Sequence, residues 1–165
     1  MLKLVDVTPS DDELLKVRIM MYEEPGIREV FNGRGDRLAT SHKVYIIMND
    51  NQEVGFANLV FEKQNYDFYF LDMGIKENYR GKGIATEVLQ TLKNINSKPI
   101  IIETRENNTL ANCSAERICC MLMSKDNKNY YLLQRERYNE FIDNGYLDKL
   151  TEHLNEDKDK RFLYK

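Results

Sequence analysis

The sequence has little of what marks several large classes of protein. Its 165 residues include no tryptophan and only three cysteines, and 24 Lys plus Arg nearly balance 27 Asp plus Glu. A net charge of −3 provides no positive field for a polyanion, so we expect no nucleic-acid partner. No apolar run approaches the roughly 20 residues that span a bilayer, and the N-terminus lacks the apolar stretch of a signal peptide. We therefore expect a cytoplasmic protein without a membrane partner.

Disulfide partners and metal ligands are also scarce. The cysteines Cys113, Cys119 and Cys120 are odd in number and lie within one segment, which predicts reduced thiols instead of a disulfide framework. The two histidines, His42 and His153, are isolated in the sequence. Since a metal centre needs several ligands in register, we predict no metal cofactor.

What is present is the composition of an ordinary globular domain, with 42% hydrophobic and 31% charged residues. Ser10 and Glu13 form a capping-box pattern at the start of a helix. The long connection 22–42 is expected to contain a short second helix, and its Arg34-Gly35-Asp36 tripeptide is interpreted as loop. Apolar patterning predicts strands at residues 2–7, 43–48, 53–62 and 67–75, the last three forming an antiparallel meander.

The second half of the chain changes period. Apolar residues at helical spacing from Ile84 to Ile95 lead into residues 99–102, a short strand that is apolar on both faces. Such a strand is typically buried and parallel to its neighbour, so residues 68–103 form a predicted β-α-β unit. Beyond it we predict a helix from Thr109 through Leu122, a strand at 130–133, helices at 135–144 and 146–155, and a closing strand at 162–164.

Together these elements predict one α/β domain of the α+β type over residues 1–165. Its central sheet is mixed but mainly antiparallel, with helices on both faces. Residues 134–165 carry more charge than the middle of the chain. They are predicted to be a mainly helical C-terminal extension of the same domain.

The most informative stretch, residues 75–86, joins a strand end to a helix start through a turn with two glycines. Gly81 and Gly83 allow a ligand to approach the backbone, and the free N–H groups at the start of the following helix attract anions. Arg80 and Lys82 add positive charge beside this turn. A phosphate-binding loop is the expected result.

Two common phosphate-binding loops fit this stretch poorly. A Walker loop needs two glycines separated by four residues and followed by Lys-Ser/Thr, which the chain lacks. Residues 81–86 differ from the dinucleotide-binding fingerprint Gly-x-Gly-x-x-Gly/Ala only at the last position, Thr86. Glu103 also lies at the spacing expected of the acidic residue that binds the ribose in such proteins. However, antiparallel strands precede the turn and a single β-α-β crossover follows it, which disfavours a dinucleotide-binding fold.

Residues 80–85, Arg-Gly-Lys-Gly-Ile-Ala, resemble the Arg/Gln-x-x-Gly-x-Gly/Ala signature of the GNAT superfamily of acetyl-CoA-dependent N-acetyltransferases. A second block, residues 102–111, is similar to that family's strand-end pattern Leu-Glu-Val-Arg-x-x-Asn-x-x-Ala. The resemblance covers the order of elements from residue 1 to about 133. It implies acetyl transfer from acetyl-CoA to an amine by direct attack of the amine on the thioester.

The resemblance also implies how the coenzyme A pyrophosphate would bind. Backbone amides of the glycine turn would hold it, with the Arg80 side chain alongside and Lys82 contributing charge. The amides concerned are those of Gly81, Gly83, Ile84, Ala85 and Thr86.

The pantetheine would pair with the backbone of Met73 to Ile75 like an added strand. This pairing requires the strand to separate from its parallel neighbour, and Gly74 would permit a bulge there. The N–H of Met73 or Ile75 would polarise the thioester carbonyl. Asn108 matches the family's pantetheine-binding asparagine, and a shifted alignment places Asn112 in that position.

Glu103 is the leading candidate for the general base that takes the proton of the amine. It ends a strand predicted to be buried, and burial would raise its pKa. Asp72, on the strand that would hold the thioester, is the second candidate. The alternative interpretation of both carboxylates is a strand-end ion pair, with Arg105 or with Lys76.

The tyrosine that serves this family as general acid is absent from both alignments, and Cys119 stands in its place when the alignment starts at Asn112. Tyr130 or Tyr131 would have to substitute, or water would reprotonate the thiolate. Without any of these the chain would be a non-catalytic acyl-CoA-binding or regulatory module. The acceptor, a small-molecule or peptide amine, and the assembly state, a homodimer included, are left open by the sequence.

Overall fold

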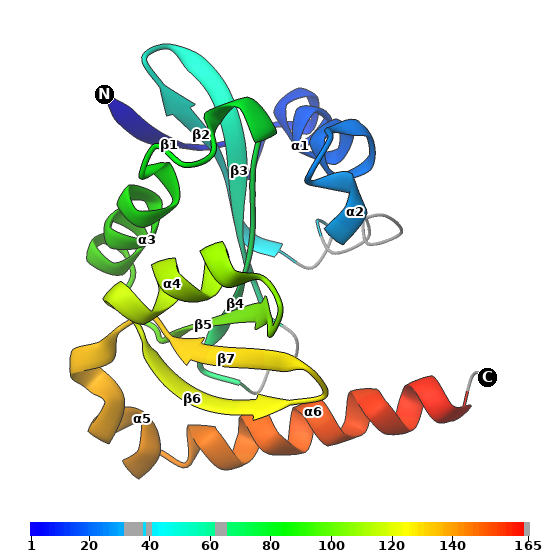
Figure 1. Cartoon of the computed structure of the whole chain (residues 1–165), viewed down its shortest axis with the longest axis vertical. Helices are drawn as coiled ribbons and strands as arrows, with labels where there is room; N and C mark the ends of the chain where they lie inside the picture. The colour runs from blue at the N-terminus through cyan, green and yellow to red at the C-terminus, as the bar shows by residue number, and fades with distance from the viewer. Residues whose placement is uncertain (32–37, 39–40, 62–65, 164–165) are drawn as a thin grey trace.

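Strands in the described part of the chain form one sheet (Figure 1). The structure is a computed structural model that describes residues 1–31, 38, 41–61 and 66–163, with side chains described to residue 156. The strands are β1 (Leu2–Asp6), β2 (Ser41–Asn49), β3 (Gln52–Val60), β4 (Tyr69–Ile75), β5 (Ile100–Arg105), β6 (Cys120–Lys125) and β7 (Lys128–Leu132). Their order across the sheet is β1-β2-β3-β4-β5-β7-β6. Every neighbouring pair is antiparallel except β4 and β5, which are parallel.

Helices cover both faces of this sheet. They are α1 (Asp11–Glu23), α2 (Arg28–Phe31), α3 (Ile84–Ile95), α4 (Thr109–Ile118), α5 (Tyr138–Asp143) and α6 (Tyr146–Leu163), with the short 3-10 helices η2 (Glu77–Tyr79) and η3 (Arg135–Arg137). In Figure 1, α3 lies on one side of β3 and β4, and α1 and α2 lie on the other. Among the described helices, none combines the length and the apolar character that a membrane span requires.

The observed arrangement confirms the predicted fold class. Strands β2, β3 and β4 form the antiparallel meander, and β4-α3-β5 is the parallel crossover. A short helix, α2, lies in the long connection that follows α1. Helices α5 and α6 lie where two helices of the C-terminal extension are predicted, and Gly145 between them has the positive φ of +75° expected at a helix stop.

Two predicted elements are wrong. The helix that begins at Thr109 ends at Ile118, and Leu122 lies in β6, a strand that was not predicted. Residues 120–125 pair with β7 as a hairpin, and this cross-strand pairing outweighs a helical apolar pattern. The closing strand at 162–164 does not form in its described part, because Phe162 and Leu163 continue α6. Tyr164 and the Arg34-Gly35-Asp36 tripeptide lie outside the described residues.

The two faces of the sheet are packed differently. One face carries a continuous apolar core under α3 and α4, which includes Ile47, Leu59, Leu71, Val88, Leu92, Ile102 and Tyr131. The other face carries two separate clusters. The α1-α2 cluster contains Val44, Ile46 and Phe56 from the sheet, and the α5-α6 cluster contains Phe68, Phe70, Ile101, Tyr130 and Leu132. A seam between these clusters therefore runs across the middle of the sheet.

The predicted capping box at α1 is half formed. Ser10 Oγ accepts a hydrogen bond from the Glu13 N–H at 3.4 Å, as predicted. The Ser10 N–H donates instead to the Val7 carbonyl at 3.0 Å, and the Glu13 carboxylate pairs with Lys16 at 3.0 Å. The chain turns back on itself before α1, so the backbone carbonyl replaces the glutamate as partner.

Two glycines allow β3 and β4 to pass closely at one end. A Cβ on Gly55 would lie 2.1 Å from the carbonyl oxygen of Gly74, a backbone atom. A Cβ on Gly74 would lie 2.8 Å from Phe56 Cε1 and 3.0 Å from two carbons of Ile27. The register of the two strands is continuous here, so the bulge predicted at Gly74 is not formed. Gly74 instead makes room for Ile27, which precedes α2.

Replacing Gly55 with alanine should destabilise the fold markedly. We expect Gly55→Ala to lower the free energy of unfolding by about 2 kcal/mol, because β3 and β4 must move apart to admit the methyl group. Gly145→Ala is the matched control, since Gly145 has a positive φ but no atom within 4 Å of the added Cβ. Gly145→Ala should lower the free energy of unfolding by only about 1 kcal/mol, the strain of an alanine in the left-handed conformation. Thermal or denaturant unfolding that finds Gly145→Ala the more damaging change would contradict this account.

Candidate active site

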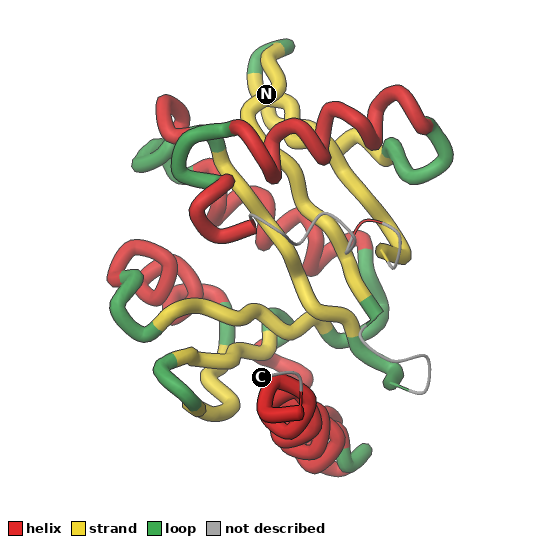
Figure 2. Tube along the Cα trace, turned by 90° about the vertical axis from the view of Figure 1, so that its right-hand side faces the viewer, coloured by secondary structure: helices red, strands yellow, loops and turns green. Residues whose placement is uncertain are grey.

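Strands β4 and β5 separate halfway along their length. They pair only where Tyr69–Leu71 meets Ile100–Ile102, although β4 continues to Ile75 and β5 to Arg105. Over the remaining length β4 stays paired with β3, and β5 stays paired with β7. The sheet therefore opens between two central strands, and Figure 2 shows its strands diverging as two groups. The separation that the coenzyme was predicted to require is present.

The opening leaves backbone groups of β4 without a neighbouring strand. The Tyr69 N–H donates at 2.9 Å to the carbonyl just before β5, and the Lys76 N–H donates at 2.8 Å to a carbonyl of β3. Because N–H groups alternate between the two edges of a strand, those of Met73 and Ile75 point toward β5, as that of Tyr69 does. Since β5 has left the pairing at this point, an extended ligand can add there as a strand.

The Arg80 side chain is bound at the end of this opening. Its Nε donates to the Ile75 carbonyl at 3.0 Å, and its Nη2 donates to the Gly26 carbonyl at 2.9 Å. A Cβ on Gly26 would lie 2.8 Å from both terminal nitrogens of Arg80. Arg80 therefore fastens the end of β4 to the turn that follows α1. A guanidinium has five N–H donors, so a contact of Arg80 with pyrophosphate beside these bonds stays a prediction.

The glycine turn has the geometry of an anion site. Gly81 and Gly83 have positive φ angles of +76° and +78°, and a Cβ on either would meet nothing within 4 Å. Gly83 is the N-cap of α3, a helix of 12 residues without a side-chain cap. The N–H groups of Ile84, Ala85 and Thr86 in its first turn therefore have no capping side chain as acceptor. Unsatisfied N–H groups and the positive end of the helix dipole together favour a phosphate.

The structure separates the two candidate asparagines. Asn112 Oδ1 accepts three side-chain hydrogen bonds, from Thr104 Oγ1 at 2.5 Å and from Asn129 Nδ2 and Tyr131 Oη at 3.0 Å. Its Nδ2 donates to three backbone carbonyls of the β5-α4 turn. Both ends of this amide are thus engaged in the fold. Asn108 is the exposed N-cap of α4, where its Oδ1 accepts from a backbone N–H at 3.2 Å. This difference favours Asn108 as the pantetheine partner.

Polar side chains from four adjacent strands line up on one face of the sheet. Asn58 of β3 pairs in register with Asp72 of β4, and Glu103 of β5 pairs with Tyr130 of β7. Asp72 and Glu103 directly follow the last paired residues of β4 and β5, so they flank the opening. Because side chains alternate along a strand, these four residues lie on the face that carries the α1-α2 and α5-α6 clusters. Asn58 and Asp72 lie at the seam between the two clusters, whereas Tyr130 belongs to the α5-α6 cluster. Asn58 was not predicted, although a lone polar residue inside the apolar stretch 54–60 signals it.

The surroundings of Glu103 differ from the prediction. Glu103 is exposed instead of buried, and its Oε1 forms an ion pair with Lys128 Nζ at 2.8 Å and accepts from Tyr130 Oη at 3.4 Å. Lys128, not Arg105, is its ionic partner because the antiparallel strand β7 places Lys128 and Tyr130 on the same face as Glu103. Asp72 is the more buried carboxylate, with 8% of its surface exposed.

Of the two tyrosines predicted to substitute for the family's tyrosine, Tyr130 lies beside Glu103. The other tyrosine, Tyr131, and Cys119, which stands in the family tyrosine's place in the shifted alignment, lie in the core under α3 and α4. Cys119 is buried in the core under α3 and α4, and burial raises its pKa to about 12. Its thiol therefore holds the proton more tightly than an ordinary thiol. Tyr131 faces that same core, where burial raises its pKa and its hydroxyl donates to Asn112.

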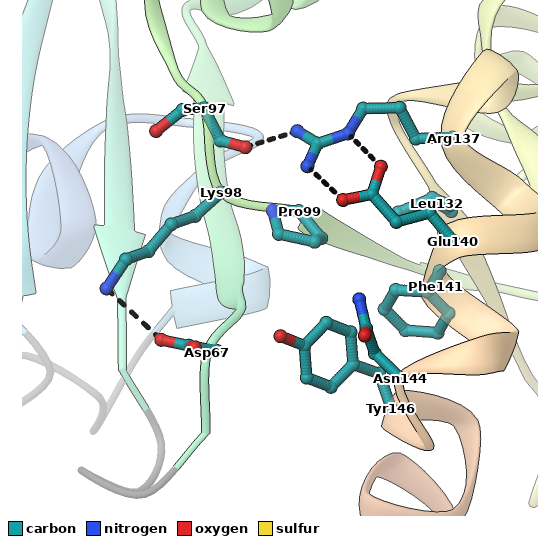
Figure 3. A pocket seen from close by; sticks show the side chains of 10 residues that line it. All are labelled: Asp67, Ser97, Lys98, Pro99, Leu132, Arg137, Glu140, Phe141, Asn144 and Tyr146. Carbon is teal, nitrogen blue, oxygen red and sulfur yellow. Dashed lines mark hydrogen bonds and ion pairs between the residues drawn. The ribbon is translucent and has the colours of Figure 1, made fainter.

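A cavity of about 170 Å³ lies at the opposite end of β4 and β5, against α5 (Figure 3). Its charged side chains are paired with one another, Lys98 with Asp67 at 3.4 Å and Arg137 with Glu140 at 3.0 Å. The lining residues are Asp67, Ser97, Lys98, Pro99, Leu132, Arg137, Glu140, Phe141, Asn144 and Tyr146. No residue of the polar row or of the glycine turn lines this cavity, so it is separate from the candidate active site.

Removal of the Arg80 guanidinium should loosen the junction of β4 with the α1-α2 turn. We expect Arg80→Met to lower the free energy of unfolding by about 1 kcal/mol, because two carbonyls lose a charged donor at a partly exposed site. Lys82→Met is the matched control, since Lys82 is exposed and its Nζ lies 5.7 Å from the centre of the Tyr79 ring. The control should change stability by less than ~0.5 kcal/mol. Identical melting temperatures for the two variants would refute the structural role of Arg80.

Comparison with known proteins agrees with this geometry. The family model described as acetyltransferase (GNAT) domain matches residues 40–131, more than half of the 165-residue chain. No curated protein sequence matches the chain.

Solved structures share the fold at low sequence identity. The N-acetyltransferase PseH of Campylobacter jejuni, in complex with acetyl coenzyme A, superposes with a TM-score of 0.55 at 14% identity and covers 81% of this chain and 98% of its own. A mutant form of the spermidine/spermine N-acetyltransferase SpeG of Vibrio cholerae has a TM-score of 0.58 at 13% identity, over 85% of this chain and 98% of its own. With the family match, the opened sheet and the glycine turn in agreement, the chain belongs to the GNAT acetyltransferase family and is an acetyl-CoA-dependent acyltransferase.

Proposed function

We propose that this protein transfers the acetyl group of acetyl-CoA to a primary amine of a small molecule. The observation that carries the proposal is the opening between β4 and β5, which has the glycine turn at one end and the polar row across it. A small-molecule acceptor is supported by the structurally similar SpeG, which is described as a spermidine/spermine N-acetyltransferase. The polar row argues against a non-catalytic module, because it supplies proton-transferring groups beside the opening.

The coenzyme would bind along the edge of β4. The first-turn amides of α3 and the amides of Gly81 and Gly83 would hold the pyrophosphate, with Lys82 adding charge. The pantetheine would pair with β4 from Met73 to Ile75, and Asn108 would contact it from the start of α4. The N–H of Met73 or Ile75, which points into the opening, would donate to the thioester carbonyl as negative charge develops on its oxygen.

The polar row would then move the proton. A primary amine must lose one proton as its nitrogen bonds to the acetyl carbon and the carbon–sulfur bond breaks. Glu103 would accept that proton as general base, directly or through one water, and Asp72 is the alternative base. Tyr130, whose hydroxyl contacts Glu103 Oε1 at 3.4 Å, would pass a proton to the departing thiolate and recover one from Glu103. No covalent intermediate on the protein is involved.

Calorimetric titration tests the coenzyme site. We expect the protein to bind acetyl-CoA and not NADH, since the described strands form a single β-α-β crossover within an opened sheet. Gly83→Val should weaken acetyl-CoA binding at least tenfold, because it strains a positive φ and places a side chain over the first-turn amides. Gly145→Val, with a similar φ but in the connection between α5 and α6, should bind acetyl-CoA normally. Binding of NADH in preference to acetyl-CoA would overturn the proposed function.

Replacement of Glu103 by glutamine tests the general base. We expect Glu103→Gln to reduce turnover at least tenfold with little change in the KM for acetyl-CoA, since general-base catalysis contributes about 10²–10⁴. Glu106→Gln, an exposed carboxylate on the turn after β5, serves as the control and should keep normal turnover. If Glu103→Gln retains turnover while Asp72→Asn loses it, the base is Asp72.

A further inference from the structure

Asn58 is a buried amide that the fold does not satisfy. Its side chain is completely buried, and neither Nδ2 nor Oδ1 has a hydrogen-bond partner among the described residues. Burying an amide without partners costs free energy that an apolar residue would not. Such a residue in the middle of an apolar strand calls for a specific explanation.

Other buried amides of the described chain are engaged by their neighbours. Gln134, 2% exposed, accepts from the Ile100 N–H at 3.0 Å and donates to the Lys98 carbonyl at 2.8 Å. Asn129, 9% exposed, donates to Asn112 at 3.0 Å and accepts from Ser124 at 2.6 Å. These side-chain amides hold the sheet together, whereas the side-chain amide of Asn58 has no hydrogen-bond partner among the described residues.

The position of Asn58 connects it with the acceptor side of the site. It lies directly opposite Asp72 in the β3-β4 register, and such pairs have Cβ atoms about 4.5–5.5 Å apart on the same face. Its neighbours Phe56 and Val44 belong to the α1-α2 cluster, and Phe70, next to Asp72, belongs to the α5-α6 cluster. Asn58 is thus at the seam, one strand away from the opening where the thioester would lie.

We infer that Asn58 recognises the acceptor, and that the acceptor is a primary amine with an oxygen acceptor close to its nitrogen, such as an amino alcohol. This inference rests on the proposed function and names the substrate class of the same site. An amide offers one acceptor oxygen and two donor N–H groups. A ligand that satisfies both ends must supply an N–H donor, which the amine does, and an oxygen acceptor. Asp72 beside Asn58 adds negative charge suited to an amine. A polyamine supplies only donors at neutral pH and would leave the Asn58 N–H groups unpaired.

Stability measurements distinguish a ligand-binding amide from a structural one. Asn58→Leu and the smaller Asn58→Val should raise the Tm by about 4 °C, because they remove an unsatisfied buried amide. Asn129→Leu is the matched control, with the same change in a strand where the amide is bonded, and it should lower the Tm. A fall in Tm for both Asn58 variants would overturn the inference, since it would show that an internal water or the fold itself uses the amide.

Acceptor kinetics test the substrate class with three probes of equal length. These are 3-amino-1-propanol, n-butylamine and 1,3-diaminopropane, compared at saturating acetyl-CoA. We expect the native protein to prefer 3-amino-1-propanol, and Asn58→Leu to lower kcat/KM for this probe about tenfold while changing n-butylamine less than about twofold. The KM for acetyl-CoA should stay unchanged.

Three outcomes would overturn the inference while leaving the proposed function intact, provided that acetyl-CoA binds in the calorimetric titration. In the first, the diamine or n-butylamine is acetylated as well as the amino alcohol. In the second, the preference survives in Asn58→Leu. In the third, none of the three probes is acetylated although the protein acetylates other amines. Failure to bind acetyl-CoA would instead reject the proposed function.

Discussion

The parting of β4 and β5 is the constraint on which the rest of the structure depends. A sheet that opens between central strands leaves backbone groups unpaired, and unpaired buried groups are costly. The flanking pairs β3-β4 and β5-β7 hold the two halves in place beyond the last β4-β5 pair. At the end of the opening Arg80 binds the Ile75 carbonyl, and Asn112 binds the turn that follows β5. These hydrogen bonds to backbone groups at the edges of the opening stabilise it, while the N–H groups of Met73 and Ile75 remain directed into it.

The unequal packing of the two faces follows from the same opening. One face is a continuous core under α3 and α4, so the crossover helix is rigidly attached and its N-terminal amides stay at the mouth of the opening. On the other face the apolar residues form two separate clusters, and Asn58 and Asp72 of the polar row lie at the seam between them. A ligand extended along β4 therefore meets the polar row on one face and the side of α3 and α4, with Asn108 at the start of α4, on the other. This asymmetry separates the coenzyme, which binds within the sheet, from the acceptor, which approaches across a face.

Local patterns in the sequence predicted most of the helices and strands. They failed where the pairing of one strand with another determines the secondary structure. The turn Asp50-Asn51, with φ of +50° and +65°, closes the predicted β2-β3 hairpin. An equivalent turn, Asp126-Asn127, with φ of +51° and +65°, closes β6-β7. That second turn was present in the sequence, but the apolar pattern continuing to Leu122 favoured a longer helix. The glycine turn was predictable because its function depends on a local backbone conformation.

The side-chain environment of the site was less predictable because strands distant in sequence create it. Glu103 was expected to be buried, yet its surroundings depend on β7, which brings Lys128 and Tyr130 to the same face. Asn58 shows the converse case. Its polarity within an apolar strand is visible in the sequence, but only the register opposite Asp72 and the absence of a partner among the described residues give it meaning. A buried amide such as that of Asn58 lowers the stability of the fold without forming a hydrogen bond in it. At the seam beside the opening, this loss of stability is compensated by specificity for the acceptor.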